Sequence, residues 1–411
     1  MDEPEVFTRY DIRGGYPDEI DEEFSLRFGK SIGKFILKEG LNKSVAVGYD
    51  TRKSSIPIKD SLISGILSMG VDVLDVGVGP TDKVSFLGNK ENCGLSIMIT
   101  ASHHSWERNG IKLLYSRGNG FSNEDLQKVK EIFTGSIEEK QMPGKLTFHD
   151  KSDEEYIKGM TLAFEKYFST IDAKVIVDCC NGAAYRSAPA VLRGLGAEVV
   201  EINCSKEVNE ELPPEPTENN RSYLKNRIKE EGADLAVGYD PDADRVFAFD
   251  NDGKWIDGDE LFCILSKIAG PEKIVASIDT SQMLEETIDA DVFYTRVGDI
   301  FVSEKGVEVE ADLLGEPNGH YAITDFSWYN SGVFSSLLLA ALADKLPRIR
   351  EEIPKFFTEQ ITVKTKDNKE KIDRMENIIE HIRKKYDIIS EIDGIKFTSD
   401  GCRSLIRPSE T

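Results

Sequence analysis

The stretch Thr100-Ala-Ser-His-His-Ser-Trp-Glu-Arg-Asn-Gly-Ile-Lys112 holds the residue types that a nucleophilic site needs. It follows residues 95–99, an apolar run short enough for a buried strand, so Ser102 is expected just past a strand end. Ligands bind at such strand ends in open α/β sheets. A serine hydroxyl needs a nearby base or cation before it attacks, and two histidines and Lys112 lie close by in sequence. The stretch therefore indicates a site around Ser102, with an ordinary polar surface loop as the alternative.

A second cluster, Gly238-Tyr-Asp-Pro-Asp-Ala-Asp-Arg245, follows an apolar strand at residues 234–237. Its aspartates are Asp240, Asp242 and Asp244. Carboxylates at i, i+2 and i+4 can converge on one hard cation, and Mg²⁺ prefers carboxylate oxygens with a few waters. An EF-hand calcium loop begins similarly, but it needs Gly and Glu where this chain has Arg245 and Asn251. The cluster predicts a magnesium site; the alternative is a solvated acidic turn, in which the carboxylates would repel one another.

Three further clusters carry residue types that suit a sugar phosphate. Arg9-Tyr-Asp-Ile-Arg-Gly-Gly15 combines a glycine pair, which permits close backbone approach, with arginines whose forked donors match phosphate. Gly315-Glu-Pro-Asn-Gly-His320 offers a carboxylate, an amide and an imidazole suited to sugar hydroxyls. Ile406-Arg-Pro-Ser-Glu-Thr411 supplies an arginine and two hydroxyls for a phosphate. The alternatives are a tight turn for the first, a turn for the second and a frayed terminus for the third.

The net charge of −23, from 51 Lys and Arg against 74 Asp and Glu, makes nucleic acid and anionic membranes poor partners. An anionic substrate stays compatible with this charge, because screening beyond about 10 Å lets local arginines and lysines dominate inside a pocket. The apolar run at residues 337–342 is far shorter than the ~20 residues of a membrane span. The acidic start lacks the basic and apolar regions of a signal peptide, so we expect a cytoplasmic protein.

The cysteines give no sign of a zinc site or of a disulfide framework. None of them forms a C-x-x-C pair, and most follow or lie within apolar runs. They are Cys93, Cys179, Cys180, Cys204, Cys263 and Cys402. We therefore expect reduced core thiols.

Apolar strands, helices and turn residues alternate in a β-α-β rhythm, which predicts parallel sheets with right-handed crossovers. The rhythm occupies residues 21–76, returns at 174–202, where the helix is expected at 183–195, and returns again at 273–295. Its strands repeatedly end in aspartate. The length of 411 residues is enough for roughly three domains of this kind.

After residue 354 the pattern changes to an expected strand at 357–363, a charged helix at 369–386 and a strand at 393–397. We therefore predict an α/β protein with three tandem, similar α/β domains, whose mixed and mostly parallel sheets surround a cleft, plus a small α+β C-terminal domain. The candidate junctions are Gly144-Lys-Leu-Thr-Phe-His149 and Asp250-Asn-Asp-Gly253. The expected domains are residues 1–146, 147–249, 250–356 and 357–411.

Together the motifs resemble those of the α-D-phosphohexomutase family, which includes phosphoglucomutase/phosphomannomutase and phosphoglucosamine mutase. The resemblance covers essentially the whole chain. The motifs stand in the family's order: Tyr10-Asp-Ile-Arg-Gly14, Thr100-Ala-Ser-His103 with Asn109-Gly-Ile-Lys112, Asp240-Pro-Asp-Ala-Asp-Arg245, Gly315-Glu-Pro-Asn-Gly-His320 and Arg407-Pro-Ser409. The resemblance implies an intramolecular phosphotransferase that interconverts the 1- and 6-phosphates of glucose and mannose, or of glucosamine. A phosphoserine enzyme and a hexose 1,6-bisphosphate would be its intermediates.

The resemblance also implies roles for the matching residues. Ser102 would carry the phosphoryl group, and together with Asp240, Asp242 and Asp244 it would hold Mg²⁺. Lys112 would be the general base or acid for the sugar hydroxyl. The other roles fall into three groups: neighbours of the transferring group (Arg13, His103, Arg245), ligands of sugar hydroxyls (Glu316, Asn318, His320) and the grip on the phosphate that is not transferred (Arg407, Ser409, Thr411).

Several positions depart from the family's pattern. His104-Ser105 stands where the family often has Asn-Pro, Leu314 replaces a common Gly, Asn318 a usual Ser, and Glu410 a usual Gly. Two alternative functions remain: a metal-dependent sugar-phosphate phosphatase that uses Ser102, and a non-catalytic sugar-phosphate-binding relative. No motif addresses position 2 of the sugar, so the preferred hexose stays open, as does the choice between monomer and homodimer.

Overall fold

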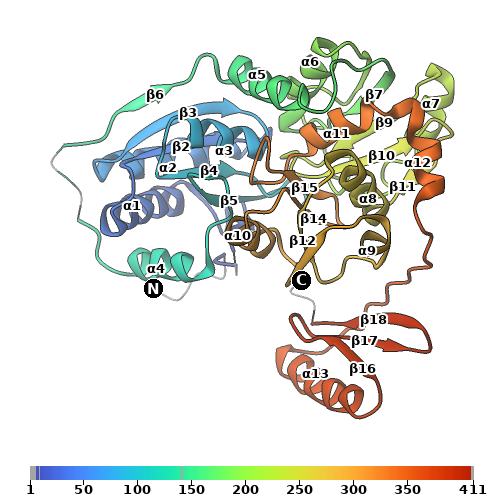
Figure 1. Cartoon of the computed structure of the whole chain (residues 1–411). Coiled ribbons are helices and arrows are strands. Elements are labelled where there is room, and N and C mark those ends of the chain that lie inside the picture. Colours follow the sequence, from blue (N-terminus) through green and yellow to red (C-terminus); the bar gives the residue numbers. More distant parts are fainter. Residues whose placement is uncertain (1–5, 9, 139, 141, 409–411) are drawn as a thin grey trace.

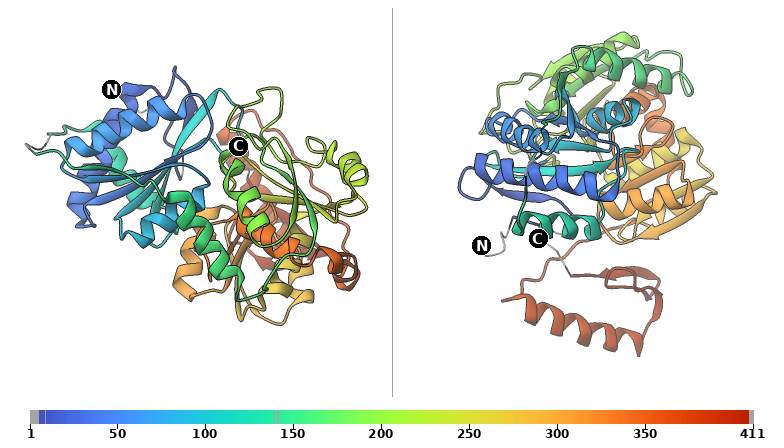
Figure 2. Two further views of the ribbon diagram at one scale, coloured as in Figure 1. Left: turned by 90° about the horizontal axis from the view of Figure 1, so that it is seen from above. Right: turned by 90° about the vertical axis from the view of Figure 1, so that its left-hand side faces the viewer.

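The computed structural model describes residues 6–8, 10–138, 140 and 142–408, and four β-sheets follow one another along this part of the chain (Figure 1). Three are mixed sheets covered by helices, and the last is a small antiparallel sheet. The three larger domains pack together, and the small domain follows an extended linker (Figures 1 and 2). It contacts the third domain, where Lys396 Nζ donates to Ile278 O at 2.7 Å and Arg403 pairs with Glu285. The predicted fold class is confirmed. No helix within the described ranges is long and apolar enough to cross a membrane.

The first sheet has the strand order β1-β5-β4-β2-β3-β6. Its strands are β1 Ile12–Gly15, β2 Ser44–Tyr49, β3 Asp72–Val78, β4 Leu95–Ile99, β5 Arg108–Tyr115 and β6 Leu146–Phe148. The pairs β1–β5 and β4–β5 are antiparallel, and the pairs β2–β4, β2–β3 and β3–β6 are parallel. Because successive side chains of a strand point to opposite faces, Val45 and Val47 pack under one set of helices and Ala46 under another. The first set is α1 Glu22–Glu39, α2 Ser55–Ser68 and α4 Asn123–Thr134; the opposite face carries α3 Thr81–Lys90.

The second sheet has the order β11-β10-β9-β7-β8 and the third the order β13-β12-β14-β15. The strands are β7 Lys174–Asp178, β8 Glu198–Ile202, β9 Leu235–Tyr239, β10 Val246–Asp250, β11 Trp255–Ile256, β12 Lys273–Ser277, β13 Asp291–Thr295, β14 Leu313–Glu316 and β15 His320–Ile323. One continuous apolar core joins a face of each sheet to shared helices, so these two domains form a single packed unit. The helices are α5 Ser152–Phe164, α6 Ser187–Gly194, α8 Gly258–Ala269, α9 Met283–Thr287, α11 Gly332–Ala340 and α12 Leu346–Glu352. The opposite faces carry α7 Leu224–Glu231 and α10 Asp299–Val309.

The small C-terminal domain packs one helix on a three-stranded antiparallel sheet, through Ile382, Ile395 and Phe397. Its elements are α13 Asn368–Arg383, β16 Asp387–Ser390, β17 Ile395–Ser399 and β18 Cys402–Ile406. The prediction of a strand at 357–363 is wrong. This segment is an extended linker in which Phe357 is 93% exposed. Its apolar alternation suits a strand, but a strand forms only where a neighbour pairs with it, and no pairing occurs here within the described residues.

Both expected domain junctions lie inside sheets. Residues 250–253 form the turn between β10 and β11, where Asp250 Oδ1 accepts hydrogen bonds from the backbone N–H groups of Asp252 and Lys254. Strand β6, within the other expected junction, pairs with β3. The helix expected at 183–195 is a 3₁₀ turn, η1 Ala183–Tyr185, followed by α6. Turn residues mark hairpins as readily as linkers, so composition alone does not separate the two.

Strands of the three large domains meet at one common region. Strand β4 leads to Ser102 and β9 leads to Asp240, and the side chains of these two residues are in contact. Strand β14 ends at Glu316, and its antiparallel neighbour β15 begins at His320, beside Asp244 of the loop after β9. The topology therefore delivers the predicted site residues to the strand ends at which α/β sheets bind ligands.

Helices α1 and α2 pack so closely that Gly65 of α2 lies against the backbone of α1. A Cβ atom at Gly65 would lie 2.1 Å from the carbonyl oxygen of Leu26. We expect Gly65→Ala to lower the free energy of unfolding by about 1–3 kcal/mol, the usual cost of overpacking. Denaturant titration measures the difference.

Gly194→Ala is the matched control, because a Cβ atom there meets nothing within 4 Å. This variant should keep the stability of the wild type or gain up to about 1 kcal/mol from the reduced freedom of the unfolded chain. Equal stability of Gly65→Ala and the wild type would contradict the close helix packing.

Candidate active site

Ser102 lies in the turn after β4 and is 3% exposed. Its φ of +49° places it in the left-handed region, which non-glycine residues rarely adopt and which often marks functional turns. Its backbone N–H donates to Thr100 Oγ1 at 2.8 Å, and Thr100 Oγ1 donates to Asp50 Oδ2 at 2.8 Å. The Ser102 hydroxyl donates to Asp240 Oδ2 at 2.7 Å. The predicted nucleophile therefore meets the first predicted metal ligand, 138 residues away in sequence.

The three aspartates after β9 converge. Asp240, Asp242 and Asp244 are fully buried, and one carboxylate oxygen of each lies within 4.8 Å of the others. Asp242 Oδ1 has no hydrogen-bond partner within the described chain, although buried oxygens normally have one. Burial raises the pKa of Asp240 well above its usual range, and the neighbouring Asp242 raises it further. An unsatisfied carboxylate oxygen within an all-oxygen donor set fits Mg²⁺.

Two cations from other strands pair with this cluster. Lys112 Nζ, on β5, donates to Asp242 Oδ2 at 2.8 Å and to Asp244 Oδ2 at 2.5 Å. Burial by itself lowers the pKa of Lys112, but the two carboxylates outweigh it and raise that pKa above its usual value. His320 Nε2, on β15, lies 3.2 Å from Asp244 Oδ1. Against the effect of burial, Asp244 helps raise the pKa of His320 to about 10, so this imidazole is charged at neutral pH.

The loop between β14 and β15 is ordered by its own side chains. Glu316 Oε1 accepts from the Gly298 N–H at 2.8 Å, and Glu316 Oε2 lies 3.1 Å from His320 Nδ1. Asn318 Oδ1 accepts from the His320 N–H at 3.2 Å. The carboxylate and the imidazole are thus held in fixed orientations on the pocket wall, where oriented polar groups can fix the position of a ligand.

A cavity of about 290 Å³ brings most of the predicted site together. The predicted residues on its walls are Arg13, Ser102, His103, Lys112, Arg245, Glu316, Asn318, His320 and Arg407. Burial and then Arg245 lower the pKa of His103 to about 2, so this imidazole is neutral and lies 3.3 Å from Ser102 Oγ. Asp240, Asp242 and Asp244 are fully buried and are not among the lining residues. Ser409 and Thr411 fall outside the described residues.

Three domain models of phosphoglucomutase/phosphomannomutase match the chain: α/β/α domain I over residues 4–140, domain II over 154–253 and domain III over 257–357. The chain belongs to this family. It is 32% identical over 412 residues to the "Probable phosphoglucosamine mutase" of Methanococcoides burtonii, covering 99% of this chain and 93% of the relative. It is also 32% identical over 426 residues to the phosphoglucomutase/phosphomannomutase of Thermococcus kodakarensis, with 99% and 92% covered.

The fold of the phosphoglucomutase/phosphomannomutase family extends over the whole chain. A crystal structure of a family protein from Burkholderia thailandensis superposes with a TM-score of 0.84 at 22% identity, over 98% of this chain and 90% of that one. The resemblance stated from the sequence motifs is confirmed. The protein is an intramolecular phosphotransferase, that is, a phosphomutase.

Arg52 holds the Ser102 loop of this phosphomutase, although no motif assigned it to the site. Its guanidinium donates at 2.5–3.0 Å to four backbone carbonyls, those of Ser102, His104, Ser105 and Arg108. Its Nε pairs with Asp50 Oδ2 at 3.0 Å, and both side chains are fully buried. The sequence signal is an arginine two residues after a strand-ending aspartate, but its acceptors lie 50–56 residues away.

Tyr329 and Asp299 are pocket residues that no sequence motif indicated. Tyr329 Oη donates to Asp299 Oδ2 at 2.7 Å and lies 3.3 Å from Asp244 Oδ2 and 3.5 Å from Lys112 Nζ. Burial and the nearby carboxylates raise the pKa of Tyr329 well above its usual value, so it acts as a hydrogen-bond donor. Its side chain links the third domain to the aspartate cluster.

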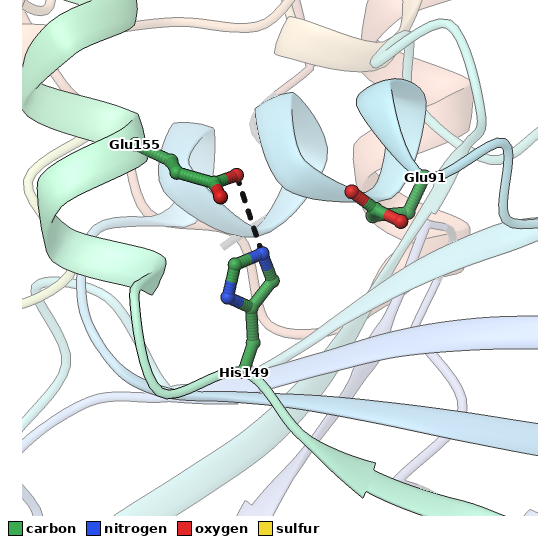
Figure 3. A group of neighbouring side chains, drawn as sticks. All are labelled: Glu91, His149 and Glu155. Carbon is green, nitrogen blue, oxygen red and sulfur yellow. Dashed lines mark ion pairs between the residues drawn. The ribbon is translucent and has the colours of Figure 1, made fainter.

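A second group of side chains of the types that bind metals consists of Glu91, His149 and Glu155 (Figure 3). None of the three lines the cavity at Ser102. His149 Nε2 is 3.4 Å from Glu155 Oε2, and Lys90 Nζ donates to the same oxygen at 2.5 Å. Glu155 is therefore already neutralised by a protein cation, and Glu91 is exposed. This group ties α3 to α5, and we assign it no ligand.

We expect Arg52→Lys to lower phosphomutase turnover by about 10²-fold, because a single ammonium cannot hold four loop carbonyls and a small displacement of the nucleophile is costly. The melting temperature should fall as well, since buried acceptors lose their donors. Steady-state kinetics and thermal unfolding measure the two effects.

Lys53→Gln is the matched control, because this neighbouring cation is 82% exposed and pairs with the exposed Glu210. Its turnover should stay within about twofold of the wild type, since exposed ion pairs contribute little. Wild-type kinetics in Arg52→Lys would show that the loop does not depend on this guanidinium.

Proposed function

We propose that the protein interconverts hexose 1-phosphate and hexose 6-phosphate, carries the phosphoryl group on Ser102 and passes through a bound hexose 1,6-bisphosphate. The observation that carries this proposal is the 2.7 Å contact between the Ser102 hydroxyl and Asp240, beside a cavity whose walls also hold Glu316 and His320. A phosphoryl carrier next to groups that bind hydroxyls suits transfer between two oxygens of one sugar. The relatives' names point to glucosamine, glucose and mannose phosphates as the substrates.

We propose that Asp240, Asp242, Asp244 and Ser102 Oγ hold one Mg²⁺. The donor set is all oxygen, as this cation prefers, and Asp242 Oδ1 lacks any other partner within the described residues. When bound, the ion offsets the negative charge that develops on the oxygens of the transferring phosphoryl group.

The residues around Ser102 supply charge and proton transfer in this proposal. The guanidinium groups of Arg13 and Arg245 attract the transferring phosphate into the cavity. Neutral His103, 3.3 Å from Ser102 Oγ, orients the hydroxyl. Lys112 Nζ, on the cavity wall, exchanges the proton of the reacting sugar hydroxyl.

The other end of the substrate must stay bound while the sugar turns to present either O1 or O6 to Ser102. Glu316, Asn318 and His320 orient the sugar hydroxyls, and Arg407 binds the phosphate that is not transferred. Arg407 lines the cavity from the C-terminal domain, with its Nη1 3.3 Å from Asp393 Oδ2. Ser409 and Thr411 complete this grip in the proposal. Closure of the small domain would clamp the substrate.

Wild-type protein with Mg²⁺ and a trace of the matching 1,6-bisphosphate should interconvert the 1- and 6-phosphates of at least one of glucose, mannose and glucosamine. Ser102→Ala should lower this turnover by about 10³-fold or more, because it removes the oxygen that carries the phosphoryl group. Coupled assays on the three sugars measure turnover, and calorimetry should show that hexose-phosphate binding is retained.

Ser105→Ala, an exposed position in the same loop, should keep turnover within a few-fold of the wild type. Undiminished turnover in Ser102→Ala would reject the phosphoserine. Release of inorganic phosphate without isomerisation would indicate the phosphatase alternative. Binding without either activity would indicate the non-catalytic one.

Removal of divalent cations with a chelator should abolish turnover, and added Mg²⁺ should restore it. Asp242→Asn keeps the side-chain volume but removes one charged ligand, so we expect the Mg²⁺ concentration for half-maximal turnover to rise by about 10–100-fold. Asp252→Asn, at a carboxylate that is 66% exposed, is the control and should leave the Mg²⁺ dependence unchanged. Equal Mg²⁺ dependence in both variants would contradict the metal assignment.

A further inference from the structure

Two parallel strands of the second domain bring a pair of cysteines into contact. Cys179 directly follows β7, Cys204 lies two residues beyond β8, and the register pairs Asp178 with Ile202. The Sγ atoms of the two cysteines lie 2.8 Å apart, although 25 residues separate them in sequence. The parallel pairing of β7 and β8 thus brings together two cysteines that do not belong to a C-x-x-C motif.

The two thiols differ in their access to solvent. Cys204 is half-buried, whereas Cys179 is fully buried, and burial raises the pKa of Cys179 well above its usual value. An oxidant therefore reaches Cys204 first, with Cys179 placed behind it as the resolving thiol. The adjacent Cys180 is engaged elsewhere, because Arg221 Nη2 donates to its Sγ at 3.0 Å.

We propose that Cys179 and Cys204 form a redox-modification site, which closes as an intramolecular disulfide in the presence of a hydroperoxide. The peroxide oxidises the Cys204 thiol to a sulfenic acid and is itself reduced, leaving water when it is hydrogen peroxide. The Cys179 thiol then attacks the Cys204 sulfur. The S–S bond forms as the S–O bond breaks, and the hydroxyl leaves with the thiol proton as water.

Cys179 stands just before residues 181–183, a segment that contacts both the aspartate loop and the first domain. The Ala183 N–H donates to Pro241 O at 2.7 Å, and Thr51 Oγ1 donates to Asn181 O at 2.6 Å. The sulfurs are already in contact, so closure needs a shift of less than about 1 Å and leaves these contacts in place. We therefore expect the disulfide to stabilise the second domain and to keep turnover within about twofold of the reduced protein.

The test uses the full chain, treated with hydrogen peroxide without denaturant, then denatured, alkylated, digested and analysed by mass spectrometry. We expect a peptide pair joined through Cys179 and Cys204, and two fewer alkylated thiols among the six cysteines. A phosphine reductant should reverse both. The midpoint of thermal unfolding should be several degrees higher for the oxidised protein than for the reduced one.

Cys204→Ser should lose both the cross-link and the temperature shift. Cys402→Ser, which removes the exposed cysteine of the small domain, should keep both. Six alkylated thiols in the peroxide-treated wild type would overturn the proposal, and so would a cross-link through Cys180 or Cys402 in place of this pair. The wild-type measurement decides the matter even where a serine variant fails to fold.

Discussion

Three carboxylates buried within 4.8 Å of one another at the end of β9 are the constraint on which the rest of the structure depends. Two ionised carboxylates at this separation repel each other by about 3–4 kcal/mol at an effective dielectric constant of about 20, which is a large fraction of the stability of a typical domain. Beyond Arg245 of the same loop, the offsetting cations come from neighbouring domains. They are Lys112 on β5 and His320 on β15. Docking of the domains and assembly of the site are therefore one process.

Backbone contacts from two other elements hold the aspartate loop in place. Asp242 O accepts from the Thr81 N–H of the first domain at 3.0 Å, and Ala243 O accepts from the Gly332 N–H at the start of α11 at 3.1 Å. The approach of α11 requires glycine, because a Cβ atom at Gly332 would lie 2.4 Å from Arg245 O. The loop that carries the negative charge is thus positioned by hydrogen bonds that do not depend on that charge. The site keeps its shape while its electrostatics are supplied by side chains.

The sequence predicts a site residue when its position follows from neighbouring residues in the chain, and misses it when the position follows from distant contacts. Ser102 and the three aspartates stand directly after apolar strands, so strand periodicity and residue type suffice to place them. Arg52, Tyr329 and Asp299 contact the site only through residues far away in sequence, and no spacing rule connects them to it. The error at residues 357–363 has the same origin, since pairing between strands is a property of the fold rather than of the segment. The contact between Cys179 and Cys204 likewise arises only from the parallel pairing of β7 and β8.

The Ser102 loop departs from the family's pattern at two positions where the contacts come from the main chain. His104 and Ser105 stand where the family often has Asn-Pro, yet Arg52 holds both positions through their backbone carbonyls, at 2.7 and 2.6 Å. Every residue type provides such a carbonyl, so side-chain replacement at these positions leaves the acceptors in place. Two further side chains hold the turn. The Ser102 N–H donates to Thr100 Oγ1, and Thr100 Oγ1 donates to Asp50 Oδ2. Variation is therefore tolerated at those loop positions where the contacts come from the main chain.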